Sequence, residues 1–267
     1  MRRAAGFVIT IAFVPALLAA QRPLAERLRA VGTGTVAFSA PARPEVCGDG
    51  IRSYNDGLSG PTTRYFDGYM LLTYEQGDTH IAPCEKGPVR VTVRMVEGAP
   101  SWMRITAGPL VALGDSVTDL GMMPASEAAA YLGALVRTGQ GRASTSALQP
   151  LVLIDSVSRW DVLVAAARDS TKPASHRRRA TDLLARAAAW TIAGDASMDD
   201  EERSARREAV YALARKRESG EDVIPVLLDI AQKNQHRDAR VAALHELGQT
   251  TDRRAIDLFA GILGGRR

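Results

Sequence analysis

The last part of the chain shows apolar residues at the spacing of helices. In residues 220–263 they recur every three or four positions in three runs, which predicts three helices joined by short turns. The first run follows Asp222 and has Pro225 in its first turn, where a missing N–H costs little. Asp238 caps the second, and Gly248 ends it as a C′ glycine would. The predicted buried positions are Val223, Val226, Leu227, Ile230, Val241, Leu244, Leu247, Ala255, Ile256, Phe259, Ile262 and Leu263.

Alternating apolar and polar residues in the first half predict β-strands. The clearest case is 89–96, where valines and a methionine alternate with Arg90, Thr92 and Arg94. Other predicted strands are 35–39, 69–74 and 101–106, with residues 55–68 as a loop or edge. Together they predict a small antiparallel sheet with one solvated face that carries Arg90, Arg94 and Arg104.

The pattern changes from strands to helices near Leu120. Helices are predicted at 22–31, before the strands, and after Pro124 at 128–136, 146–155 and 173–193. Ser158-x-x-Asp161 and Ser197-x-x-Asp200 are typical of residues that open two further helices. Because the strands come first and the helices second, the fold class is α+β.

A motif recurs among the C-terminal helices. Ala209-Val210-x-x-Leu213 matches Ala243-Leu244-x-x-Leu247, each with an arginine three residues earlier, and residues 177–184 fit more loosely. The offsets, about 34 and 29 residues, are typical of stacked helix pairs. Over residues 158–263 the chain resembles HEAT repeats in their short bacterial form. The resemblance implies an α-solenoid with an extended face for a protein partner; a plain helical bundle is the alternative.

The N-terminus has the features of an export signal. Met1-Arg2-Arg3 precedes an uncharged, mostly apolar run over residues 4–18, and Ala19-Ala20 offers small residues for cleavage. We therefore expect a signal peptide at 1–20, a small β-rich domain at 21–120 and a helical repeat domain at 121–267. The expected location is periplasmic or extracellular, with membrane anchoring only if the segment stays uncleaved.

Two cysteines, Cys47 and Cys84, lie in the β-rich part. In an oxidising compartment such a pair is most simply a disulfide. On the chain-entropy account, closing a loop of this length contributes about 3–4 kcal/mol. Unpaired or metal-associated thiols are the alternative.

Composition and charge describe an ordinary folded protein. The 267 residues are 46% hydrophobic and 24% charged, with a net charge of +4, so nucleic acid is not favoured as a partner. Basic residues nevertheless crowd two predicted helices, and a polyanion-binding face is an alternative function. The candidate binding residues are Arg177, Arg178, Arg179, Arg203, Arg207 and Arg240.

An enzymatic alternative rests on Gly114-Asp115-Ser116-Val117-Thr118. This run looks like the first block of GDSL-type hydrolases, which would make Ser116 the nucleophile. The family's Gly-x-Asn-Asp and Asp-x-x-His blocks are missing, and a serine without a base is a poor nucleophile. We therefore expect no enzymatic activity, and a turn at Gly114-Asp115-Ser116.

No metal or cofactor is expected. Asp78, His80 and Cys84 lie close in sequence, but Cys84 is expected to be bridged to Cys47. The group of His236, Asp238 and His245 does not have the i, i+4 histidine spacing of zinc-binding helices. The sequence thus predicts a non-enzymatic, exported helical-repeat scaffold behind a disulfide-braced β domain. Its partner is expected to be another protein, and the sequence leaves open whether it binds a small molecule.

Overall fold

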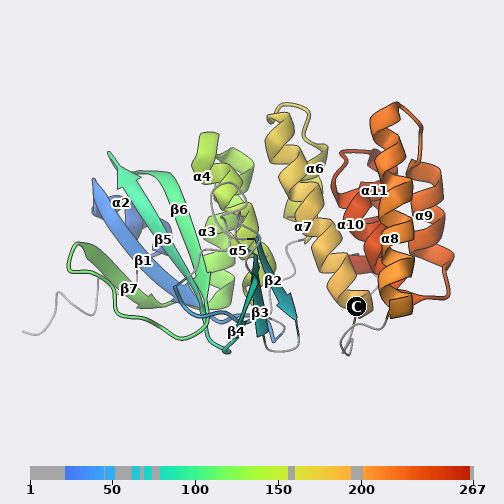
Figure 1. Ribbon diagram of the computed structural model, residues 1–267. Helices are drawn as coiled ribbons and strands as arrows, with labels where there is room; N and C mark the ends of the chain where they lie inside the picture. Colours follow the sequence, from blue (N-terminus) through green and yellow to red (C-terminus); the bar gives the residue numbers. More distant parts are fainter. Residues whose placement is uncertain are drawn as a thin grey trace, which may run out of the picture.

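The structure is a computed structural model that describes residues 22–44, 46–51, 62–66, 69–73, 79–155, 160–193 and 201–264. Side chains are not described for residues 62–83, 190, 193 and 201–205. The predicted signal peptide lies outside the described residues. The molecule has a β part and a helical part side by side, connected through helices α3 to α5 (Figure 1).

A four-stranded sheet forms the β part. Its strands are β1 (Gly34–Ala40), β5 (Val89–Val96), β6 (Ala99–Ala107) and β7 (Val117–Met122), in the order β6-β5-β1-β7. Neighbouring strands are antiparallel except β1 and β7, which are parallel. The expectation of a wholly antiparallel sheet is therefore wrong at this edge. The edge strand β7 has no buried residue and no alternating pattern, which is why its sequence does not predict it.

The β5–β6 hairpin follows the prediction closely. Glu97 and Gly98 both have positive φ angles, 51° and 76°, as a two-residue turn between twisted antiparallel strands requires. Val89, Val91, Val93 and Met95 of β5 face the core, whereas Val96 at its end is exposed. Arg90, predicted to be exposed, is buried because the loop after β6 covers it, and its guanidinium donates to the carbonyl of Val111.

A second, three-stranded sheet contains β2 (Thr62–Phe66), β3 (Tyr69–Thr73) and β4 (Thr79–Pro83). Both of its strand pairs are antiparallel, and β3 lies in the middle. The sequence predicted β3 alone. Its neighbours lie in stretches rich in glycine and polar residues, where the alternation of a half-buried strand is weak.

The predicted disulfide is present: Cys47 and Cys84 are bonded, with Cα atoms 5.2 Å apart. Beside it, Gly48 and Glu85 exchange two backbone hydrogen bonds of 2.9 Å. A Cβ atom on Gly48 would lie 2.2 Å from the carbonyl oxygen of Ala107, so only glycine allows this approach to the end of β6. The disulfide and this contact fix residues 46–51 against the sheet.

The described helices follow the predicted positions with small differences. They are α2 (Leu24–Ala30), α3 (Ala125–Thr138), α4 (Gly141–Ser146), α5 (Leu148–Leu153), α6 (Trp160–Arg168), α7 (Ala174–Ala193), α8 (Glu201–Arg215), the 3-10 turn η1 (Lys216–Ser219), α9 (Ile224–Lys233), α10 (Arg237–Gly248) and α11 (Arg253–Gly264). The helix predicted at 146–155 is replaced by α4 and α5, which meet at Ala147.

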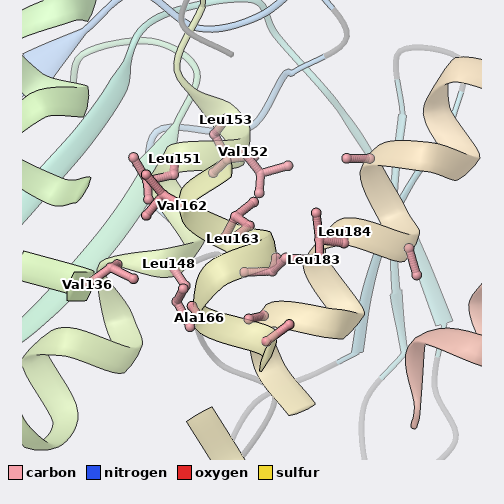
Figure 2. Packing of buried hydrophobic residues seen from close by; sticks show 14 of the residues in the cluster. Val136, Leu148, Leu151, Val152, Leu153, Val162, Leu163, Ala166, Leu183 and Leu184 are labelled. Carbon is pink, nitrogen blue, oxygen red and sulfur yellow. The ribbon is translucent and has the colours of Figure 1, made fainter. Parts of the chain in front are cut away.

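One cluster of buried hydrophobic side chains extends from the sheet through the helical part. Helix α5 is central to it. Figure 2 shows Leu148 and Leu151 of α5 with Val136 of α3, Leu163 of α6 and Leu184 of α7. The boundary expected near Leu120 falls inside β7, and the core runs across it. The sheet and the helices are therefore packed as one unit.

The helical array is not stacked in chain order. Helix α10 contacts α7, α8 and α9, and α11 contacts α6, α7 and α9. Figure 1 shows α10 and α11 between α6 and α7 on one side and α8 and α9 on the other. The array therefore ends at α8 and α9, although these helices are not the last in the chain.

Two details of the predicted helices are corrected. Gly248 is the last helical residue of α10, and the C-cap is Gln249, which has a negative φ of −78°. Gly248 therefore is not a left-handed C′ residue. Val226, predicted to be buried, is 49% exposed because α9 lies at the end of the array and is packed on one side.

Candidate functional site

The relative directions of the helices come from their side-chain contacts. Arg237, at the start of α10, donates to the carbonyl of Ile192 near the end of α7. Gly248, at the end of α10, approaches Ala185 in the middle of α7. Helices α7 and α10 are therefore antiparallel.

Helices α8 and α10, which share the repeated motif, are parallel. Arg206 of α8 forms an ion pair with Asp238 of α10, with Nε and Oδ2 2.9 Å apart. Beyond the other end of α8, Arg217 Nη1 lies 3.4 Å from the carbonyl oxygen of Glu246. Asp238 was expected to cap α10, but it lies inside the first turn, and the N-cap is His236. Its carboxylate joins the two repeats. Burial alone would raise the pKa of Asp238, but the hydrogen bond from Arg206 helps to lower it below its usual value.

The arginines predicted on α7 have different environments. Arg178 is exposed. Arg177 Nη1 donates to the carbonyl of Lys172 at 2.5 Å, which closes the start of the helix. Arg179 is half-buried and donates to Asp182 at 3.0 Å and to the side-chain oxygen of Gln149 in α5. Burial lowers the pKa of Arg179. Arg179 therefore holds α7 against α5 rather than facing a partner.

The predicted arginines of α8 and α10 are also partly engaged. Arg240 is half-buried and donates to the carbonyl of Asn234 at 2.7 Å. Arg207 is half-buried, and the side chain of Arg203 lies outside the described residues.

The structure does not bring the six predicted arginines together. Because α7 is antiparallel to α10, residues 177–179 lie toward the C-terminal end of α10. The ion pair between Arg206 and Asp238 places Arg207 and Arg240 toward its N-terminal end. Phosphate tracking needs a continuous row of cations, and this arrangement divides them between the two ends of the array.

Ser116 lies in an exposed turn before the edge strand β7. The amide of Val117 donates to the carbonyl of Gly114 at 2.9 Å, which closes the predicted turn. The apolar residues before Gly114 form no strand, although the hydrolase alternative needs one there. The imidazole of His176 contacts Thr145 in the helical part, 3.1 Å from its hydroxyl.

A pocket of about 210 Å³ lies between α3 and α6, with an apolar lining and Arg137, Asp169 and Lys172 among its residues. Within the described part of the chain, no group of three or more His, Cys, Asp and Glu side chains is placed to hold a metal. Among the described helices, none combines the length and the hydrophobicity that a membrane span requires.

The sequence pattern placed Val226 on the buried face of its helix, whereas the structure exposes it. It lies at the open end of the array, in the first turn of α9. It is the one strongly exposed large apolar side chain among the described residues from α8 to α11. Val226 follows Pro225 where the helix begins, and its helical spacing is that of a buried residue. The sequence pattern therefore gave no sign of its exposure.

Comparison with known families supports the repeat assignment for the C-terminal part. The family model described as HEAT repeats matches residues 193–266, which include α8 to α11. The match is shorter than the resemblance over 158–263 and leaves out α6 and most of α7. This agrees with the geometry, because α8 is parallel to α10 whereas α7 is antiparallel to it. Comparisons with curated proteins and with solved structures gave no significant match. HEAT repeats generally mediate protein binding, which indicates an interaction scaffold.

Proposed function

We propose that this protein is an exported, non-enzymatic scaffold that binds another protein at the open end of its helical array. The main support is the HEAT-repeat region, in which α8 and α9 form the end that no further described helix covers. Val226 exposes 49% of its surface there. An exposed apolar side chain at the end of a repeat array is the kind of anchor that a partner covers.

The proposed anchor is flanked by polar groups suited to the rim of an interface. Asp229 and Lys233 form an exposed ion pair one and two turns further along α9, at 2.6 Å. Ile230 is half-buried and adds apolar surface one turn after Val226. Because interfaces combine an apolar centre with a polar rim, α9 offers a small but complete docking face.

Export is supported by the sequence of residues 1–20 and by the disulfide between Cys47 and Cys84. Thiol labelling of the protein from its native compartment tests this. We expect no reactive thiol before reduction and two after it. Two reactive thiols in the untreated protein would contradict export.

The binding proposal is tested with the full chain as bait in an extract of the native compartment. Any captured protein is then purified, and its affinity for the chain is measured by titration calorimetry. Val226→Asp should weaken binding about tenfold or more, because a carboxylate would be buried against the partner. Since Val226 is exposed, the variant should fold normally.

The matched control is Gln232→Asp, which adds the same charge to an exposed position on another side of α9. It should keep the affinity of the original chain. Equal binding by the original chain and Val226→Asp, or equal losses in both variants, would reject α9 as the docking face.

A further inference from the structure

The outer face of the four-stranded sheet carries an exposed tryptophan between two arginines. Trp102 of β6 is 44% exposed and pairs with Arg94 of β5 in the strand register. Arg104 lies two residues further along β6, on the same face. Both arginines are exposed, so the indole and two arginines share one face of the sheet.

An apolar border lies next to these three side chains. Ile51, Leu110 and Val111 are 58%, 51% and 40% exposed. Arg104 Nη2 donates to the carbonyl of Ile51 at 2.6 Å, which places Ile51 beside the arginine. A Cβ on Gly50 would lie 3.1 Å from a methyl group of Val111, so the two border segments touch. Four of the seven strongly exposed large apolar side chains in the described residues gather here.

The backbone beneath this surface is held in place. The amide of Gly50 donates to the carbonyl of Ala107 at 2.8 Å. The Cys47–Cys84 disulfide anchors the same segment three residues earlier. The carboxylate of Asp49 accepts from the amide of Ile51 at 2.9 Å, within its own loop. A surface that is ordered before binding loses less conformational entropy when a partner docks.

We propose that Trp102, Arg94, Arg104, Ile51, Leu110 and Val111, here called the Trp102 surface, dock an acidic segment of a partner protein that also carries aromatic or large aliphatic side chains. Guanidinium groups bind carboxylates with two parallel hydrogen bonds. The indole and the aliphatic border bury the apolar residues of the same segment. Tryptophan and arginine are also the side chains most enriched at the energetic centre of interfaces.

Charge and chemistry favour this occupant over a nucleic acid. A phosphate backbone needs a row of cations, whereas this surface combines two arginines with three aliphatic side chains. The surface also lies on the β part, away from the open end of the helical array (Figure 1). It is therefore a second site, independent of the one around Val226.

The test uses the full chain and a fluorescein-labelled peptide of alternating glutamate and leucine with one tyrosine. Fluorescence anisotropy should show saturable binding that weakens as sodium chloride is raised. Trp102→Ala and Arg94→Glu should each lower the affinity about tenfold or more. The same peptide with glutamine in place of glutamate should bind at least about tenfold more weakly.

Arg178→Glu is the matched control, because it reverses an exposed arginine on α7. It should leave peptide binding unchanged. Circular dichroism and thermal melting establish whether each variant is folded. If Trp102→Ala does not fold, the affinity of Arg94→Glu for the peptide tests the proposal. Absence of saturable binding, or an equal loss with Arg178→Glu, would overturn the proposal. The variants of the Trp102 surface could instead lose self-association in sedimentation and keep their affinity for the peptide. That result would assign the surface to a second copy of the chain.

Discussion

At the scale of single residues, Gly248 determines how closely α10 approaches α7. A Cβ at this position would lie 2.6 Å from the Cβ of Ala185, a distance that requires the two helices to separate. Alanine normally stabilises a helix relative to glycine by about 0.5–1 kcal/mol. Forcing an extra methyl into a packed core costs about 1–3 kcal/mol, so the clash outweighs the gain.

We therefore expect Gly248→Ala to lower the free energy of unfolding by about 1–2 kcal/mol. Gly261→Ala is the control, because no atom lies within 4 Å of a Cβ at that position of α11. It should stabilise the protein by about 0.5–1 kcal/mol. Urea unfolding followed by circular dichroism measures both, and a stabilising effect of Gly248→Ala would contradict the close packing.

His176 is a buried imidazole in the first turn of α7. It is 2% exposed, and its Nδ1 lies 3.1 Å from the hydroxyl of Thr145. Its Nε2 is buried and has no hydrogen-bond partner among the residues that the structure describes. Burial lowers the pKa of His176 below 6.5; Lys172 lowers it further, and Asp169 opposes this. The folded protein therefore holds the imidazole in its neutral form.

This environment predicts a loss of stability in mild acid. The unfolded chain takes up the proton near pH 6.5, whereas the lowered pKa means that the folded chain takes it up only at a lower pH. Stability therefore falls as the pH drops below 6.5 toward the folded pKa. We expect His176→Asn to lose less stability than the original protein between pH 7.5 and 5. Parallel unfolding curves for both proteins over this range would show that His176 does not titrate as inferred.

At the scale of elements, Asp182 is the charge centre of α7. Its carboxylate accepts from Arg179 at 3.0 Å and from Arg186 at 3.1 Å, and its side chain is only 12% exposed. Arg179 also reaches Gln149 in α5. Removing the carboxylate would leave Arg179 half-buried without its counter-charge.

We expect Asp182→Asn to destabilise the protein by about 1–3 kcal/mol, the range for hydrogen bonds to charged groups. Asp229→Asn in α9 is the matched control, since it also breaks an ion pair at i,i+4. Both side chains of that pair are well exposed, so no measurable loss is expected. Thermal melts of the two variants compare them directly, and equal losses would refute a special role for Asp182.

Secondary structure was predictable wherever one face of an element is buried. β5 has alternating buried positions and α11 has apolar residues at every turn, so the sequence pattern predicted both elements. β7 has no fully buried residue, since only Val117 and Leu120 are half-buried, and it pairs with β1 at the edge of the sheet. Its position depends on β1, which lies about 80 residues earlier, and no local pattern records such a partner.

At the scale of the whole molecule, the C-terminal helices hold the array together. Helices α10 and α11 lie between α6 and α7 on one side and α8 and α9 on the other. In a solenoid stacked in chain order, the last repeat is a removable end. Here its removal would expose the buried faces of α7, α8 and α9 at once.

We therefore expect a chain that ends at Asn234 to lose structure well beyond the deleted helices. Amide exchange in α7 and α8 should become faster, and circular dichroism should fall by more than the two missing helices contribute. Unchanged protection of α8 and α9 in the shortened chain would show that they are held by other contacts.

The sequence by itself determined the α+β class, the disulfide, most helices and the HEAT character of the C-terminal part. Apolar spacing predicts the helices and strands, and the presence of two cysteines predicts the disulfide. Both predictions can be made without knowing the tertiary structure. Only the tertiary structure decided that β7 runs parallel to β1, that α10 and α11 lie inside the array, and that the predicted arginines are divided between its ends. These features depend on contacts between distant segments, whose energies are set by the packing of surfaces that a one-dimensional pattern does not bring together.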